Sequence, residues 1–333
     1  MALTPLEMQA PELAEPPDPE ADAEIAGRSP FQIAMSRLRT DKIAIVCAVI
    51  VFIFILIAIF APLLTKLFGV ELRAGDPSTD TDIFNFPVIG PPDHPFTWDA
   101  PLGLAPDTGD DNLAEWFHGA RTSLLIASIA TVVATTIGIT LGLIAGFSRG
   151  ALDRVISFVI DVFLALPFLM MALTVAPIIV LRFNDQPNVL RYANMIAVIA
   201  ILIITGWMGL ARLIRGEVLS LREREFVQAA RVMGVPTRRI LFKELLPNMV
   251  APIVVSFSLT LPAIVTAEAG LAYLGIGVIG QPSWGQTVLK AVPYFDTYPL
   301  YLYAPVIGIF LLVVALNLLG DAIRDAFDPK TRR

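Results

Sequence analysis

The chain has 333 residues, of which 56% are hydrophobic and only 16% are charged, whereas a soluble domain carries about 25% charged residues. So few polar side chains cannot cover two soluble domains, and much of the surface must therefore face lipid. A single cysteine excludes a disulfide scaffold, and a formal net charge of −6 argues against nucleic-acid binding by bulk charge.

The N-terminal segment is polar and acidic. Residues 1–27 carry seven acidic residues, no Lys or Arg, and several prolines that interrupt any helix. This composition predicts a disordered, proline-rich cytoplasmic tail over residues 1–30. Residues 31–42 (FQIAMSRLRTDK) then have the pattern of a short, basic, amphipathic helix that leads into the membrane.

Long apolar runs follow, each bounded by charged or interfacial residues. A helix needs about 20 residues to cross the hydrocarbon core of a bilayer. The sequence therefore predicts an all-α membrane protein with six transmembrane helices, at 43–65, 122–148, 155–181, 194–211, 248–280 and 300–320.

The basic residues fix the orientation of these helices. With the N-terminus inside, 18 of the 24 Lys and Arg residues lie on the inner side. Because basic residues concentrate in cytoplasmic connections, we expect both termini to be cytoplasmic, with residues 321–333 as a cytoplasmic tail.

The first outer connection, 66–121, is unusually long. Its residues 66–120 hold ten acidic residues, two basic residues and seven prolines. Connections of this length are normally functional or disordered. Within it, residues 112–121 (NLAEWFHGAR) have the pattern of a short amphipathic helix at the outer interface.

The inner loop 212–247 is the most informative segment. Its apolar spacing predicts a helix that Gly234 ends in the left-handed conformation. Pro236 suits the first turn of a second helix. A plain basic connector is the simpler interpretation. A DNA-binding helix-turn-helix has similar spacing, but two membrane helices hold this one against the bilayer, so we expect no nucleic-acid partner.

The run QAARVMGVPTRRILFKELLP in this loop resembles the signature of permease subunits of ATP-binding-cassette importers. The family pattern is E-A-A, three residues, Gly, nine residues, Ile, any residue, Leu-Pro. Two positions depart, since Gln228 replaces the family's Glu and Glu244 its Ile. The resemblance implies that the ATPase-coupling residues are Glu225, Gln228, Ala229, Ala230, Gly234, Leu246 and Pro247.

Other segments are similar to the peptide and nickel branch of that family, and in particular to its C-type subunit. They are GARTSLL (119–125), DVFLALPFLMMAL (161–173), AEAGLAYLGIGV with QPSWG (267–285) and NLLGDAIRDAFDPKTR (317–332). This resemblance covers about residues 31–333, with a lengthened outer loop.

The resemblance implies a type I importer fold in the cytoplasmic membrane of a prokaryote and import of di- or oligopeptides, with nickel or another solute as the alternative. It also implies a sister permease, two ATPase domains and an extracytoplasmic substrate-binding protein as partners. No phosphate-binding loop of the form G-x-x-x-x-G-K-[ST] occurs in the chain. We therefore expect ATP and Mg to bind the partner ATPases and the chain itself to be no enzyme.

Asp161 and Glu268 are the carboxylates that fall within predicted spans. A carboxylate in hydrocarbon is costly, so each is a candidate for the translocation path or gate, as is Pro167, which can kink its helix. The alternative for Asp161 is a structural ion pair, with Arg154 as its nearest partner in sequence. For Glu268 it is helix packing.

Two rival functions remain open from the residues alone. An autonomous channel or ion-coupled carrier needs charged residues in several spans, and an embedded enzyme needs paired acid, base or metal-binding groups. Neither set is present in the predicted spans, and the two histidines, His94 and His118, form no metal-binding pattern.

Overall fold

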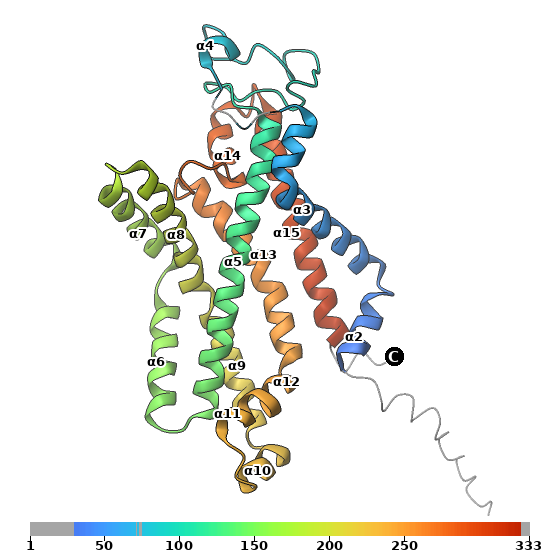
Figure 1. Cartoon of the computed structure of the whole chain (residues 1–333), viewed down its shortest axis with the longest axis vertical. Coiled ribbons are helices and arrows are strands. Elements are labelled where there is room, and N and C mark those ends of the chain that lie inside the picture. The colour runs from blue at the N-terminus through green and yellow to red at the C-terminus, as the bar shows by residue number, and fades with distance from the viewer. Residues whose placement is uncertain (1–29, 71, 73–74, 328–333) are drawn as a thin grey trace, which may run out of the picture.

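The computed structural model describes residues 30–70, 72 and 75–327. The predicted tail therefore lies almost entirely outside the described residues, as do the last six residues of the chain. Every regular element in the described part is a helix, and the long helices run side by side along one axis (Figure 1). The predicted all-α fold class is confirmed.

The helices follow one another along the chain with short connections except at residues 81–111 and 274–283. Their bounds are α2 Pro30–Leu38, α3 Lys42–Phe68, α4 Pro77–Asp80, α5 Asn112–Phe147, α6 Ala151–Ala165, α7 Phe168–Phe183, α8 Pro187–Gly206, α9 Met208–Leu221, α10 Glu225–Val232, α11 Thr237–Arg239, π-helix η1 Ile240–Leu245, α12 Leu246–Asn248, α13 Val250–Tyr273, α14 Trp284–Ala291, 3₁₀-helix η2 Val292–Tyr294 and α15 Pro299–Phe327.

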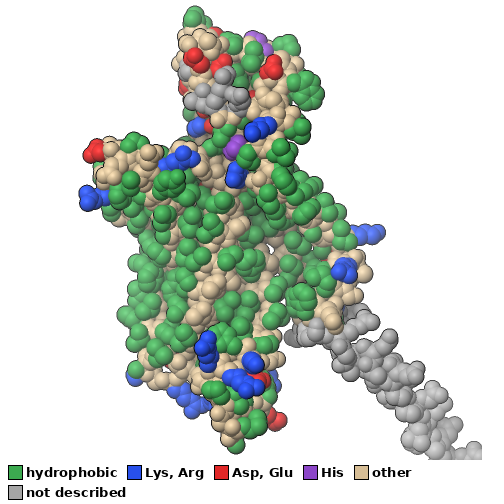
Figure 2. Space-filling view, viewed as in Figure 1, with side chains coloured by type: hydrophobic (Ala, Val, Ile, Leu, Met, Phe, Trp, Pro, Cys, Tyr) green, Lys and Arg blue, Asp and Glu red, His purple; other side chains and the backbone are tan. Residues whose placement is uncertain are grey.

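Length and hydropathy identify the helices able to cross a membrane. In the described part of the chain, α3, α5, α8 with α9, α13 and α15 each suffice alone, and α6 with α7 forms a sixth span if the bent pair is counted as one. Hydrophobic side chains cover the middle of the visible face, and most charged ones lie toward its ends, apart from basic side chains at the right edge (Figure 2). This distribution matches a bilayer around the middle of the bundle.

The third predicted span is broken at Pro167. α6 and α7 meet at an angle of 82° instead of forming one continuous helix over 155–181. Proline lacks a backbone N–H and forces the residue before it into extended geometry, and Leu166 has ψ of 124°. The kink expected from Pro167 is therefore a full interruption.

The fourth span is longer than the sequence predicts. α8 and α9 together run from Pro187 to Leu221, so the predicted inner loop actually begins inside a helix. Leu210, Ile214 and Val218 are buried along one side of α9, and this packing continues the helix past Arg212, whose charge ended the apolar run.

The short interfacial helix expected at 112–121 is wrong as a separate element. These residues form the first turns of α5, which is 36 residues long and therefore about 54 Å from end to end. Asp111 caps the helix, because its carboxylate accepts the backbone N–H of Ala114 at 2.8 Å.

α5 and α9 pack with their backbones in close approach. Gly138, Gly142 and Gly146 share one face of α5, and a Cβ at any of them would lie 2.6–2.9 Å from atoms of residues 207–218. Small residues at four-residue spacing allow helices in membranes to touch in this way. The two helices are therefore held together along most of the inner half of the bundle.

Candidate functional site

The inner end of the molecule is formed by residues 222–248, here named the inner lever (Figure 1). α10 ends as predicted, with Gly234 at φ +73°. The N–H of Gly234 donates to the carbonyl of Arg231, and that of Val235 to the carbonyl of Ala230, both at 3.0 Å. These two bonds make a Schellman motif. Pro236 precedes α11 instead of lying in its first turn.

The structure separates the two alanines of the signature. Ala230 is buried against Val227, Ile240 and Leu245, so it holds the lever together, whereas Ala229 is exposed. The other candidate coupling residues are placed as follows: Glu225 is exposed at the start of α10, Gln228 donates its amide to the carbonyl of Arg222 at 3.1 Å, Leu246 is half-buried and Pro247 is exposed.

Sequence reasoning missed the most exposed apolar side chains of the lever. Val232 and Met233 are 89% and 74% exposed at the turn before Gly234. Large apolar side chains exposed together at a water-facing end mark an interaction surface. Met233 was expected on the apolar stripe of this helix, with Ala229, and that expectation is wrong, because both are exposed. For Val232 the available signal was its position outside the stripe.

The inner lever is fastened to the inner end of α5. Arg222 donates to the carbonyl of Gly146 at 3.0 Å, and the guanidinium of Arg231 lies 4.6 Å from the centre of the Phe147 ring. The buried cluster beneath the lever also contains side chains of α5, α9 and η1. A force on the lever therefore reaches the membrane helices directly.

A groove with a volume of about 570 Å³, here named the inner groove, lies between the α6–α7 break, α8, α9 and α13. No charged side chain lines it among the described residues, and hydroxyls and glycines interrupt its apolar walls. Its lining includes Leu164, Phe168, Thr205, Gly209, Leu213 and Ser256. Pro167 lies directly before Phe168 at its edge.

Asp161 pairs with a different residue from the one nearest in sequence. Its carboxylate accepts a hydrogen bond from the guanidinium of Arg212 on α9, whereas the side chain of Arg154 donates to the carbonyl of Gly150. A second pair, Asp153 with Arg215 at 2.7 Å, joins the same two helices. The structural ion pair expected as the alternative is therefore present, with Arg212 as its partner.

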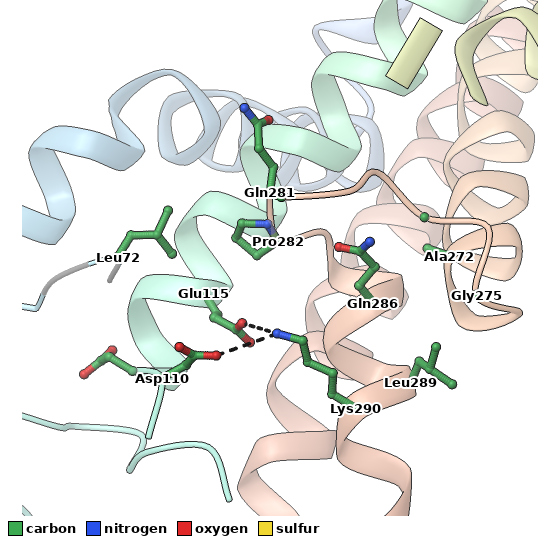
Figure 3. Close-up of a pocket in the computed structure, with 13 residues that line it drawn as sticks. Leu72, Asp110, Glu115, Ala272, Gly275, Gln281, Pro282, Gln286, Leu289 and Lys290 are labelled. Atoms are coloured by element: carbon green, nitrogen blue, oxygen red, sulfur yellow. Dashed lines mark hydrogen bonds and ion pairs between the residues drawn. The ribbon is translucent and has the colours of Figure 1, made fainter. Parts of the chain in front are cut away.

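At the outer end, a cavity with a volume of about 580 Å³ lies beside α14 (Figure 3). Lys290 on α14 points at two carboxylates, and its Nζ lies 2.7 Å from Oε1 of Glu115 and 3.8 Å from Oδ2 of Asp110. Burial alone would lower the pKa of Lys290, but the two carboxylates outweigh it and raise that pKa. Burial raises the pKa of Asp111, in the same wall, to about 6.

α14 is inserted tightly between the long helices. The indole of Trp284 is fully buried and donates to the carbonyl of Trp116 at 3.0 Å, and Phe54 meets the Trp284 ring edge-on. A Cβ on Gly285 would lie 2.5 Å from the carbonyl oxygen of Ala269 on α13. The segment QPSWG thus fixes α14 against three spans.

Glu268 lies beside this insertion and does not line either cavity. It is 1% exposed, and neither carboxylate oxygen has a hydrogen-bond partner of good geometry among the described residues. The hydroxyl groups of Ser123 and Ser283 are the polar groups that interact electrostatically with its carboxyl group. Its placement fits helix packing rather than contact with a solute, and the three path candidates are not brought together.

Residues 75–111 form a folded unit beyond the membrane helices, here named the outer cap (Figure 1). It is tied to η2 and to the residue before α15, because the Tyr294 hydroxyl donates to Asp107 and Phe86 stacks on Tyr298 at 5.7 Å. Ile83 and Trp98 at its surface are 92% and 70% exposed.

Comparison with known proteins identifies two family models in the chain. Residues 138–333 match the model for a binding-protein-dependent transport system inner membrane component. Residues 29–82 match the N-terminal transmembrane domain of oligopeptide transport permease C.

Curated relatives match over nearly the whole length. The chain is 33% identical to the oligopeptide transport system permease protein OppC of Bacillus subtilis, covering 90% of each protein. It is 34% identical to the dipeptide transport system permease protein DppC of Alkalihalophilus pseudofirmus, covering 96% of each. It is 31% identical to OppC of Escherichia coli, covering 93% of this chain and 94% of that protein.

Among solved structures, the fold is similar to a chain of the inward-facing MetNI methionine ABC transporter. The TM-score is 0.51 at 20% identity, over 64% of this chain and 96% of the other. The type I importer architecture implied by the resemblance is thereby confirmed. The chain belongs to the family of binding-protein-dependent transport system inner membrane components, which are permease subunits of the bacterial cytoplasmic membrane.

Proposed function

We propose that the chain is the permease subunit of an importer that carries di- or oligopeptides into the cell. The observation that carries the substrate class is the match, over nine-tenths or more of the chain, to relatives named for oligopeptide and dipeptide transport. A binding-protein-dependent permease is a transport subunit and not an enzyme, which argues against both an autonomous channel and an embedded enzyme.

The inner lever is the part of this proposal that couples transport to ATP hydrolysis. Val232 and Met233, with Ala229 and Glu225 on the same short helix, would seat on a partner ATPase. Two ATPase domains would bind the ATP and Mg. Because Arg222 and Arg231 hold the lever to the end of α5, closure of the ATPases would shift α5 and α9 as a unit and change which side of the membrane the path faces.

The inner groove is the proposed half of the translocation path, and a sister permease supplies the other half. The groove is lined by residues of α6, α7, α8, α9 and α13, and none of the described lining residues is charged. Such a surface suits peptides whose side chains vary, because no fixed charge or narrow pocket selects one of them.

The outer cap is the proposed contact for the extracytoplasmic binding protein. It carries exposed Ile83 and Trp98, and Asp107 and Phe86 join it to Tyr294 and Tyr298, in the segment that connects α14 to α15. Docking on the cap would therefore act on the elements that surround the outer cavity. Replacing residues 78–99 by a short Gly-Ser linker should weaken stimulation of the ATPases by the binding protein, and unchanged stimulation would contradict this role.

The proposed function is tested by reconstituting the chain with its sister permease and ATPases in proteoliposomes. Labelled tripeptide should accumulate only with ATP and with the peptide-loaded binding protein outside. Excess nickel should not compete. Peptide flux through this chain alone, or uptake of nickel in place of peptide, would contradict the proposal.

A further inference from the structure

Two ion pairs join α6 to α9, and they differ in their exposure. The side chains of Asp153 and Arg215 are 21% and 30% exposed, and Ser157 also donates to Asp153. The side chains of Asp161 and Arg212 are 62% and 60% exposed. The Asp153–Arg215 pair is therefore largely shielded from solvent, whereas the Asp161–Arg212 pair is exposed.

The open pair lies at the edge of the inner groove. Leu164, one turn after Asp161, lines the groove, and so do Gly209, one turn before Arg212, and Leu213, the residue after it. Neither charged side chain is part of the lining itself. The pair thus borders the groove at the level where α6 and α9 approach each other.

The pair lies in the inner part of the hydrophobic layer that the apolar runs define. Asp161 is ten residues from the start of α6, and Arg212 is nine residues from the end of α9. Charged residues lie between the pair and those helix ends: Asp153 and Arg154 on α6, and Arg215 on α9. Asp161 therefore falls inside the apolar run 155–181, and Arg212 directly follows the run 194–211. An exposed charged pair at that depth is placed toward a water-filled or protein-lined space, because lipid would solvate it poorly.

We infer that the Asp161–Arg212 pair binds the charged ends of the peptide as it passes, with Arg212 on the terminal carboxylate and Asp161 on the terminal ammonium. The inference rests on the proposed function, since it requires a peptide in the groove. A zwitterionic peptide replaces each partner by a group of the same charge, so no charge is left unpaired in the low-dielectric interior.

The chemistry of the two side chains suits this exchange. A planar guanidinium donates two parallel hydrogen bonds to a carboxylate, and a carboxylate accepts the hydrogen bonds that an ammonium donates. Because the peptide supplies a new partner for each side chain, opening the pair leaves neither charge unpaired. Because the rest of the groove is uncharged, the peptide termini are the features shared by all such substrates that the groove can hold electrostatically.

The test uses the complete transporter in proteoliposomes, supplied with saturating binding protein that is loaded with trialanine. The double variant Asp161→Asn/Arg212→Gln leaves no unpaired charge and should fold. We expect the peptide imported per ATP hydrolysed to fall about 10-fold, with the stimulated ATPase rate unchanged. The matched control, Asp153→Asn/Arg215→Gln, should leave this ratio unchanged.

The single variant Arg212→Gln refines the assignment. Its import rate relative to wild type should fall about 10-fold for trialanine and less than about 2-fold for the trialanine amide, which lacks the carboxylate. Because each variant rate is divided by the wild-type rate for the same peptide, the binding protein's own preference between the two peptides does not affect the comparison.

A double variant with an unchanged import-to-ATP ratio would overturn the inference, as would an equal loss of ATPase stimulation and import, which indicates a structural role. Absence of ATP-dependent peptide import by the wild type would instead contradict the proposed function. The two failures are therefore distinguishable.

Discussion

The outer and inner ends of the bundle differ in where their buried and exposed groups find partners. At the outer end, α14 is enclosed by α5, α13 and α15, Trp284 is fully buried, and Lys290 is paired within the chain. At the inner end, Val232 and Met233 remain exposed on a short helix held by Arg222 and Arg231. The outer end is stabilised by its own contacts, whereas the inner end presents a surface that a partner would complete.

The most damaging change to the outer end should be Trp284→Ala. Removing a large buried aromatic side chain costs about 3–5 kcal/mol, and the cavity would lie between α14, α5 and α3. Thermal unfolding of the purified protein in detergent should show this loss. Trp284→Phe retains most of the packing and should cost less. If Trp284→Ala unfolded at the wild-type temperature, α14 would not be the fixed element described above.

Lys290→Met should cause the next largest loss of stability, about 3 kcal/mol, because it leaves the buried Glu115 carboxylate without its cation. Adding Glu115→Gln removes the stranded charge and should restore most of the stability. Unfolding midpoints of the two single variants and the double variant give the coupling between the residues. Additive losses in the double variant would show that the pair is not the main connection.

At the inner end, Gly234→Arg should weaken binding of the ATPases at least about 10-fold while membrane insertion is preserved. A non-glycine residue at positive φ costs about 1–2 kcal/mol, and a Cβ at this position has no atom beyond its chain neighbours within 4 Å, so the new side chain extends into the space that a partner would occupy. Co-purification of the ATPases measures the effect. Gly234→Asn, which tolerates this conformation, is the control, and normal co-purification of Gly234→Arg would show that the turn is not part of the contact.

The smallest expected effect is a pH dependence at the outer end. The pKa of Asp111 is about 6 in the folded protein and 3.8 for the unperturbed side chain, so between these values the folded state binds more protons than the unfolded state. Stability therefore falls as the pH rises, by about 1 kcal/mol between pH 5 and 7.5 from this group. Asp111→Asn should remove this contribution to the pH dependence. If the change in stability between pH 5 and 7.5 stayed the same in the variant, another group would be responsible for it.

The sequence was sufficient for the fold class and for the turn at Gly234, because apolar runs and a helix-ending glycine are local signals. It was insufficient where packing decides. The charge of Arg212 marked the end of an apolar run, yet buried contacts of Ile214 and Val218 continue the helix. Pro167 predicted a kink, but its 82° angle depends on what α6 and α7 pack against.

The candidate site shows the same limit. The partner of Asp161 is 51 residues away in sequence, so no spacing rule could identify Arg212 in preference to the nearby Arg154. Likewise, the pattern of α10 did not distinguish Ala230, which is buried, from Ala229, which is exposed. Exposure of Val232 and Met233 follows from the orientation of the helix on α5, which is a tertiary property.

Gly138, Gly142 and Gly146 of α5 set a limit on how this protein can vary. At Gly142 even one added methyl group would lie 2.7 Å from the Ala211 carbonyl oxygen and from the Ile214 Cβ, so a Gly→Ala exchange there forces two spans apart. The tip of the outer cap has no such constraint, because Ile83 is in contact with almost nothing. In a saturation mutagenesis screen for uptake, a single carbon atom at position 142 should therefore be less tolerated than the loss of most of a side chain at position 83.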